Sequence, residues 1–222
     1  MTDFREFLQN HSASFEPMFR PGLTQANTIP IDLSSASYDF NGLDEAALDQ
    51  AIADIISDGS ALAAVGGYLE KRSVYRATDL FDGDQKRCIH VGVDVFIAAA
   101  SPLFLPFAGV VHSFANRQLS GDYGPVIIMK HDLDGFEFHS LYGHLSESSL
   151  EGLFEGKAIV QGEKFAEVGA RPLNGNWPPH LHFQFIRDMQ GKQGDYPGVA
   201  RLEEIDFFKQ NCPDPTGIIL SA

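Results

Sequence analysis

Hydrophobic residues near the N-terminus follow a helical spacing in one long segment. In NGLDEAALDQAIADIISDG, residues 41–59, apolar side chains recur at intervals of three and four residues, which places them on one helix face. These side chains are Leu48, Ile52, Ile55 and Ile56. A turn at Asn41-Gly42 begins the segment and Gly59 ends it, so the pattern predicts one amphipathic helix.

From about residue 61 onward, the pattern changes to short runs rich in β-branched and aromatic residues, separated by Gly, Pro, Asn and Asp. The runs are ALAAVGGYLE, RSVYRATDLF, CIHVGVDVFI, FAGVVHSFA, GPVIIMKH, FEFHSLYGHL, KAIVQGEKFAEVG and HLHFQFI. Runs separated by turns roughly every 8–15 residues are typical of an antiparallel sheet, in sandwich or barrel-like form. We therefore predict a mostly β fold with an antiparallel β-sandwich or sheet core.

The region before these runs has a different character. Residues 1–40 combine a short helix-like start with the extended, proline-containing stretch NTIPIDLSSAS, whose pairing partner the sequence does not reveal. Together with the predicted helix, this region forms an N-terminal α+β appendage, which we place at residues 1–70. Residues 71–222 then form the β domain, and no internal repeat or low-complexity tract divides the chain further.

The charge balance limits the partners that we expect. Sixteen Lys and Arg residues stand against thirty Asp and Glu residues, which gives a net charge of -14. Such a chain repels phosphate backbones and anionic lipid headgroups, so we expect no nucleic-acid partner and no membrane partner. No apolar run approaches the roughly 18 residues that a membrane-spanning helix needs, and we expect a soluble protein.

The N-terminal residues and the cysteines bear on the compartment. The start, MTDFREFLQNHSASF, lacks a basic patch followed by an apolar stretch, so it does not resemble a secretory signal. Cys88 and Cys212 are too few for a disulfide framework and suit a reducing environment. We expect a cytoplasmic protein, although a chain from which a signal had been removed would look the same.

Two histidines lie on one face of the last predicted strand. In HLHFQFI, His180 and His182 are two residues apart, and on a strand this spacing directs both side chains to the same side. The opposite face takes Leu181, Phe183 and Phe185. A polar pair therefore stands opposite an apolar row.

The segment IHVGVDVFI brings a histidine and a carboxylate to one face in the same way. As a strand, it directs Ile89, Val91, Val93 and Val95 to the core and the intervening residues to the other side. A helix would also align His90 with Asp94, but three valines and a glycine disfavour it. Residues four apart on a straight strand are separated by about 13 Å, too far for ligands of one ion. We therefore expect Gly92 to supply a bend or bulge.

Neutral imidazoles and one carboxylate are a ligand set that suits zinc. Three protein ligands leave the fourth position of a tetrahedral ion for water, which is the arrangement of a catalytic site. The chain has no HExxH segment, so the metalloprotease mechanism that uses a glutamate base on such a helix is excluded.

From His90 to about Phe185, the sequence resembles the lysostaphin/LytM-type zinc endopeptidases. The family pattern begins with His-x3-Asp, written here HVGVD, and continues through SPLFLPFAGVV, YGPVIIMKH, LYGHL and a GxxxxxGexxxxVG segment to HLHF, in the family's order. The resemblance implies a LytM-type β core and a zinc ion. It implies His90, Asp94 and His182 as ligands, and His144 and His180 as catalytic histidines that do not bind the ion.

Two further features set this chain apart within the resemblance. The lead-in to the last strand, GARPLNGNWPPHLHF, is longer than in most members, and we expect residues 171–179 and the N-terminal region to border the cleft. The segments YGPVII, LYGHLS, NGNWPPHLHFQ and DYPGVA, preceded by GGYLEKRSVY, resemble more closely the peptidase-like segment of intracellular fusion proteins with kinase-like and class-III aminotransferase-like portions.

The resemblance implies a zinc metallopeptidase that cleaves a peptide or small amide inside the cell. One alternative is a catalytically idle member that binds a peptide or partner in the cleft. Another is an exported peptidoglycan endopeptidase.

Three nearby residues keep two interpretations each. Tyr142 is an oxyanion donor or a packed aromatic, and Trp177 is a substrate-binding platform or a loop anchor. Cys88 lies near the metal or is an inert buried thiol.

Overall fold

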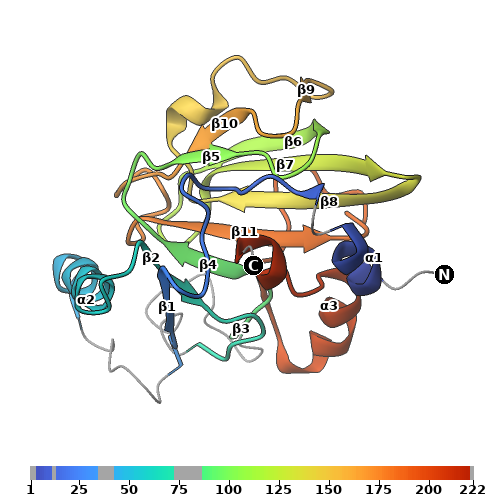
Figure 1. Cartoon of the computed structure of the whole chain (residues 1–222). Helices are drawn as coiled ribbons and strands as arrows, with labels where there is room; N and C mark the ends of the chain where they lie inside the picture. Colours follow the sequence, from blue (N-terminus) through green and yellow to red (C-terminus); the bar gives the residue numbers. More distant parts are fainter. Residues whose placement is uncertain (1–3, 12–13, 35–42, 73–86, 221–222) are drawn as a thin grey trace.

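An eight-stranded sheet organises the computed structural model, which describes residues 4–11, 14–34, 43–72 and 87–220 (Figure 1). The strand order is β1-β2-β4-β11-β8-β7-β6-β9. The strands are β1 (Thr28–Ile31), β2 (Ala63–Gly66), β4 (Val93–Phe96), β6 (Gly109–Arg117), β7 (Gly124–Leu133), β8 (Phe136–Gly143), β9 (Ala158–Ile159) and β11 (His180–Ile186). The mostly β prediction is confirmed.

Smaller elements cover this sheet. Two two-stranded sheets pair β5 (Pro102–Phe104) with β10 (Lys164–Glu167) and β3 (Ile89–His90) with β12 (Val199–Ala200). The helices are α1 (Phe4–His11), α2 (Glu45–Asp58), α3 (Ile205–Asn211) and α4 (Thr216–Ile219), with short 3-10 turns η4 (Glu147–Leu150) and η5 (Leu202–Glu204). Of the helices in the described ranges, none has the length and apolar character that crossing a bilayer requires.

One pair of strands departs from the expected antiparallel arrangement. Strands β1 and β2 are parallel, so the large sheet is mixed. Parallel neighbours need a crossover connection, and α2 lies between these two strands in the chain. The extended stretch with no identifiable partner is therefore the first strand of a β-α-β unit.

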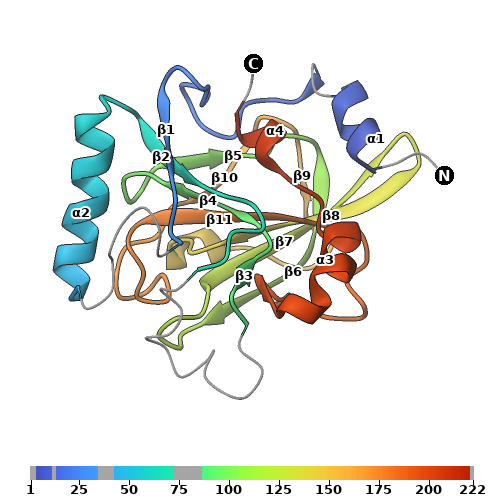
Figure 2. The ribbon, with the colours of Figure 1, turned by 90° about the horizontal axis from the view of Figure 1, so that it is seen from below.

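Helix α2 forms where the apolar spacing predicted it. The Asp44 carboxylate caps its first turn by accepting a hydrogen bond from the Ala47 backbone N–H at 2.8 Å. Ile52 is buried, and Leu48 packs against the same small apolar cluster, which also contains Leu33 and Phe96. The helix lies alongside β1 and β2 at the edge of the sheet (Figures 1 and 2). The expected turn at residues 41–42 and most of the run RSVYRATDLF lie outside the described residues.

Both faces of the large sheet are packed. One face carries the main apolar cluster, which includes Phe183 and Phe185 of β11 and Phe4 of α1. The other face carries a second cluster, which includes Ile186 of β11 and Phe208 of α3. The N-terminal region thus contributes strands to the sheet and side chains to its core, and a domain boundary at residue 70 stays a prediction.

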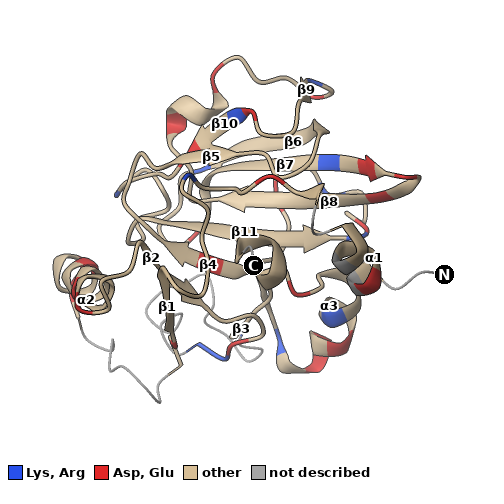
Figure 3. Ribbon diagram, in the orientation of Figure 1, with Lys and Arg blue, Asp and Glu red and all other residues tan. Residues whose placement is uncertain are grey.

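Acidic side chains are spread over several elements rather than confined to one. Figure 3 shows them on α1, α2 and the hairpin formed by β7 and β8. In α2 they are Glu45, Asp49, Asp54 and Asp58. The excess of negative charge in this protein is therefore distributed along the chain.

Candidate metal centre

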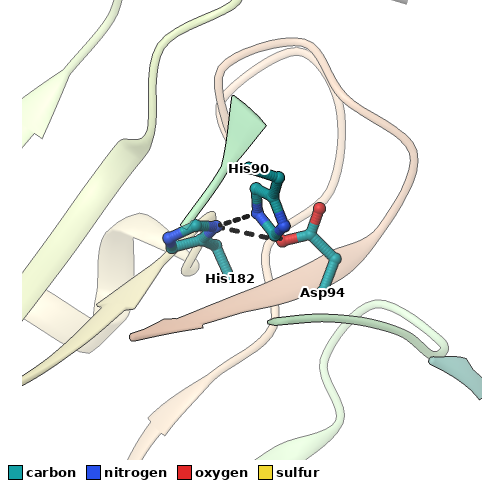
Figure 4. Close-up of side chains that lie close together, drawn as sticks. All are labelled: His90, Asp94 and His182. Carbon is teal, nitrogen blue, oxygen red and sulfur yellow. Dashed lines mark hydrogen bonds and ion pairs between the residues drawn. The ribbon is translucent and has the colours of Figure 1, made fainter. Parts of the chain in front are cut away.

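Three strands bring His90, Asp94 and His182 together (Figure 4). His90 ends β3, Asp94 lies in β4, and His182 lies opposite Asp94 in the antiparallel pairing of β11 with β4. The His182 Nδ1 atom is 2.9 Å from His90 Nε2 and 3.0 Å from Asp94 Oδ1, and His90 Nε2 is 3.2 Å from that oxygen. All three side chains are buried. Three potential ligand atoms therefore converge on one point.

A bend in the backbone at Gly92, between β3 and β4, produces this convergence. Strand β3 pairs with β12, whereas β4 pairs with β2 and β11, so the chain changes sheets between His90 and Val93. A Cβ atom on Gly92 would lie 2.7 Å from Cε1 of His182, closer than real Cβ contacts come. The expected bend at Gly92 is confirmed, and the glycine also makes room for the His182 ring.

Because of this bend, one detail of the predicted strand is wrong. Val93 and Val95 pack in the main cluster as expected, but Ile89 and Val91 pack in the second cluster. A continuous strand would have placed all four on one face. Because the chain turns at Gly92, the alternation restarts there.

Hydrogen bonds at the far side of each ring leave the converging nitrogens without protons. The Nδ1–H of His90 donates to the Gly67 carbonyl at 3.3 Å, which leaves Nε2 with a lone pair. In the tautomer of His182 whose Nε2–H donates to Oε1 of Gln184 at 3.1 Å, Nδ1 carries a lone pair toward His90 and Asp94. The Gln184 amide is oriented by its own N–H bond to the Pro197 carbonyl at 3.2 Å.

In these tautomers, two lone pairs and a carboxylate oxygen face one another at about hydrogen-bond distance. Such a set repels itself and is stabilised by a cation. Ligand atoms around a tetrahedral zinc ion with bonds of about 2.0–2.1 Å lie roughly 3.3–3.4 Å apart, close to the separations seen here. The residues present fit zinc.

Buried charges keep the carboxylate ionised and the histidine neutral. Burial alone would raise the pKa of Asp94, but its electrostatic interactions with the His90 ring and with the charged Arg72 guanidinium hold that pKa well below its usual range. The Arg72 guanidinium contacts Oδ2, the Asp94 oxygen that does not face the two histidines. Burial, followed by the Arg72 charge, lowers the pKa of His90 to about 3. Both groups therefore stand in the protonation state that binds a metal ion.

His144 and His180 lie beside these three residues. Their ring centroids are 4.1 Å apart, and Nε2 of His180 is 3.9 Å from Oδ2 of Asp94. The Nδ1–H of His180 donates to the Pro178 carbonyl at 2.7 Å, and that of His144 donates to the Asn174 carbonyl at 2.8 Å. Each ring therefore keeps a lone pair on Nε2. Burial lowers the pKa of both side chains, which are neutral near pH 7.

The backbone of His144 has an unusual conformation. Its φ of 60° lies in the left-handed region that a side chain with a Cβ rarely occupies. Two hydrogen bonds hold it there: its N–H donates to the Tyr123 carbonyl at 2.8 Å, and its carbonyl accepts from the Gly169 N–H at 2.8 Å. Strained residues held in this way are concentrated at functional sites.

A cavity of about 220 Å³ opens onto all five of these residues. Trp177 and Pro178 line it from the loop before β11, and Leu48 and Ile52 line it from α2. The prediction that this loop and the N-terminal region border the cleft is confirmed. The Trp177 ring centroid is 6.5 Å from that of His144.

The substrate-binding role expected for Tyr142 is wrong. Tyr142 lies opposite Phe183 in the pairing of β8 with β11, and both side chains are buried in the main cluster on the other face of the sheet. Its hydroxyl accepts a hydrogen bond from Ser140 at 3.1 Å. The packed-aromatic interpretation is the correct one. Cys88 is half-buried, packs against the second cluster and is not one of the three converging residues.

Sequence reasoning missed three residues of the site. Tyr123, from the loop before β7, places its ring 5.2 Å from the His182 ring and 5.7 Å from the His144 ring. Gln184 and Arg72 contact the converging residues from outside. For Gln184, its position two residues after His182 was a usable signal, because it shares that face of the strand.

The arrangement defines a β-sheet protein with a candidate metal centre of two histidines and one aspartate. Residues 88–195 match the family model described as Peptidase family M23, a match over just under half of the 222-residue chain. The match includes the three converging residues together with His144 and His180. Strands β1 and β2 and helix α2 lie before it.

Several solved structures are similar to this chain. A putative peptidase M23 from Pseudomonas aeruginosa is 22% identical, with 58% of this chain and 42% of that chain covered and a TM-score of 0.38. A zinc containing peptidase from Vibrio cholerae is 21% identical, with 54% of this chain and 31% of that chain covered and a TM-score of 0.38. The catalytic domain of lysostaphin from Staphylococcus simulans is also 21% identical, with 58% of this chain and 86% of that chain covered and a TM-score of 0.37. The chain thus spans less than half the length of the first two. Among curated proteins, none matches it.

Proposed function

We propose that this protein is a zinc-dependent hydrolase that cleaves a peptide or amide bond with an activated water molecule. The observation that carries the proposal is the convergence of three proton-free ligand atoms from His90, Asp94 and His182 beside two further neutral histidines. The match of residues 88–195 to a peptidase family supports the choice of a peptide or amide bond.

His90, Asp94 and His182 are the proposed ligands. A zinc ion supplies Lewis acidity toward a carbonyl oxygen and lowers the pKa of a water molecule toward neutrality. The outer contacts of these residues fix them for the task. Gln184 sets the tautomer of His182, and Arg72 fixes the Asp94 carboxylate with one oxygen directed at the histidines.

His144 and His180 are the proposed acid–base residues. Each donates its Nδ1 proton to a backbone carbonyl, so Nε2 is free to accept a proton from the attacking water and return it to the leaving amine. Once protonated, either ring also stabilises a negatively charged oxygen. The adjacent Asp94 charge favours protonation of both rings.

Trp177 and Tyr123 are the proposed aromatic contacts of the substrate. Both line the cavity, and both lie within ring-contact range of His144. Trp177 thereby takes the platform role of its two interpretations. Tyr123 replaces Tyr142 as the aromatic residue next to the reacting bond.

Separate measurements of zinc and turnover test the assignment. We expect about one zinc ion per chain in the purified protein, measured by plasma mass spectrometry. His90→Ala and Asp94→Ala should abolish zinc binding, whereas His144→Ala and His180→Ala should keep it. Turnover in the latter two should fall roughly 10²–10⁴-fold, the usual loss for an acid–base or oxyanion group.

The substrate panel separates the remaining functions. Glycine-rich, D-alanyl and ordinary short peptides, together with peptidoglycan fragments, are incubated with the zinc-loaded protein and analysed by mass spectrometry. Cleavage that only peptidoglycan fragments undergo would favour a wall endopeptidase. Full zinc occupancy with binding but no cleavage of any member would favour an idle binding protein. Zinc retained in His182→Ala and lost in His180→Ala would overturn the ligand assignment.

A further inference from the structure

The cavity at the candidate metal centre has an apolar side built by residues that precede the family-matched segment. Leu33, Leu48 and Ile52 line this side, and all three lie before residue 88. Phe96 continues it toward the centre, since its ring stacks on that of His180 with centroids 4.8 Å apart. We call these four residues the apolar wall. It reaches the proposed catalytic histidines directly.

Another part of the cavity lining is charged. Arg117 there forms ion pairs with Asp122 at 3.1 Å and with Asp195 at 3.3 Å. Asp122 accepts a hydrogen bond from the backbone N–H of Tyr123, whose ring lies 5.2 Å from the ring of His182. The lining of the cavity at the candidate centre therefore offers a bound molecule both apolar and charged surface.

A chain of polar contacts fixes the apolar wall relative to Asp94. The Leu33 backbone N–H donates to Oε1 of Glu70 at 2.9 Å, and Oε2 of Glu70 accepts from Nε of Arg72 at 2.6 Å. The same guanidinium contacts Asp94. The side chains of Arg72 and Asp94 are almost fully buried. The position of the wall is thus tied to that of a proposed ligand.

Helix α2 is also fastened to the loop on its other side. Nε of Arg171 lies 2.9 Å and 3.0 Å from the two carboxylate oxygens of Asp49, and the Asn176 amide donates to Glu45. Trp177 follows directly in this loop. Figure 2 shows α2 running along β1 and β2 at the edge of the sheet. Polar contacts therefore hold the apolar wall both at Leu33 and at helix α2.

We propose that the apolar wall is a subsite for an aliphatic side chain next to the bond that is cleaved. The substrate is then a short peptide or amide with a leucine-like group on the Phe96 side. This inference rests on the proposed hydrolase function. Aliphatic surface gains free energy when such a wall removes it from water, whereas glycine offers none to remove. An acidic side chain gains nothing there and is repelled by the protein's net charge of -14.

Trp177 provides a direct measurement of binding, because it is the single tryptophan of the chain and lines the cavity. The purified full chain is titrated with N-acetyl tripeptide amides that differ only in a central Gly, Leu or Asp. The Trp177 fluorescence is read immediately after each addition of peptide. We expect the Leu peptide to bind roughly tenfold tighter than the Gly peptide, or more, and the Asp peptide to bind most weakly. Equal affinities, or no response to the Leu peptide at millimolar concentration, would overturn the proposal.

Two substitutions on the same helix localise the effect. Leu48→Asp places a charge in the wall, whereas Ala53→Asp places the same charge on an exposed position of α2 away from the cavity. We expect Leu48→Asp to remove the preference for Leu over Gly and Ala53→Asp to keep it. If Leu48→Asp does not fold, Leu48→Ala should reduce the preference several-fold. A folded Leu48 variant with the full preference would contradict the subsite.

Binding and cleavage measurements distinguish a failure of the subsite from a failure of the proposed function. Selective binding of the Leu peptide without cleavage of any peptide would overturn the proposed function and leave the subsite standing. Cleavage of Gly and Leu peptides with equal affinity and equal rate would leave the function standing and overturn the subsite.

Discussion

The two faces of strand β11 place neighbouring residues in opposite environments. On one face, Leu181, Phe183 and Phe185 pack among many other apolar side chains of the main cluster. On the other face, His180, His182 and Gln184 each meet a few named polar partners. Apolar packing is non-directional and shared among many contacts, so its loss weakens the whole fold. The contacts on the polar face are made by single atoms, so the loss of one such contact should affect metal binding or catalysis rather than the stability of the whole fold.

His182→Ala is the substitution with the largest expected effect on the polar face. Removal of one of three ligand atoms should reduce the zinc content from about one per chain to near zero. The metal-free protein should lose little stability, because one of three mutually repelling groups is gone. Metal analysis after dialysis, with urea unfolding of the stripped protein, measures both. A folded variant that keeps stoichiometric zinc would break the contrast.

Phe183→Ala, one residue away, should have the opposite result. Truncation of a fully buried phenylalanine costs about 3–5 kcal/mol of unfolding free energy. The fraction that remains folded should still bind zinc, since the ligands are untouched. The same two measurements apply. A variant of normal stability that has lost zinc would show that the two faces are not separable.

Gly92→Ala sharpens the comparison with a single methyl group. The added Cβ would meet the His182 ring and the Phe183 carbonyl oxygen, both at 2.7 Å. We expect a loss of about 1–3 kcal/mol in unfolding free energy together with weaker zinc binding, because the ring must move. A Gly217→Ala control adds a methyl group that has no heavy atom within 4 Å. Equal zinc affinity in the two variants would count against a close fit at His182.

Gln184→Met has the smallest expected effect. It removes the hydrogen bond between Gln184 and Nε2 of His182, a proposed ligand. Methionine keeps the length of the side chain but accepts no comparable bond from Nε2–H of His182. We expect about 10–100-fold weaker zinc binding, the usual effect of losing such a partner. Gln184→Glu keeps an acceptor and should retain the affinity. Competition titrations with a zinc indicator measure it, and identical affinities in Met and Glu variants would exclude the tautomer role of Gln184.

Sequence periodicity predicted those parts of the fold that local pattern decides. The helix at residues 45–58 and the two-sided strand of β11 follow from the spacing of apolar residues within each segment. The pairing of β1 with β2 did not follow, because pairing depends on contacts between distant segments. Parity alone also misplaced Ile89 and Val91, since the chain changes sheets at Gly92.

The candidate site could also be predicted only in part from the sequence. His90, Asp94 and His182 were predicted through a sequence resemblance, and their convergence agrees with it. Tyr142 was misassigned because a spacing of two residues implies a shared face only along a continuous strand, and β8 ends at Gly143, before His144 with its left-handed backbone. Tyr123 was missed because it reaches the site from a loop, where no periodicity indicates direction.

The β-α-β unit at the N-terminus has a consequence for shortened forms of this protein. Strand β4, which carries Asp94, pairs with β2 on one side and β11 on the other. A chain that began at residue 71 would lack β2, and β4 would become an edge strand with a row of unsatisfied backbone groups. Such edges pair readily with other chains. A fragment limited to the family-matched segment should therefore self-associate through β4, the strand that carries Asp94. In the full chain, β2 covers this edge and should thereby reduce aggregation.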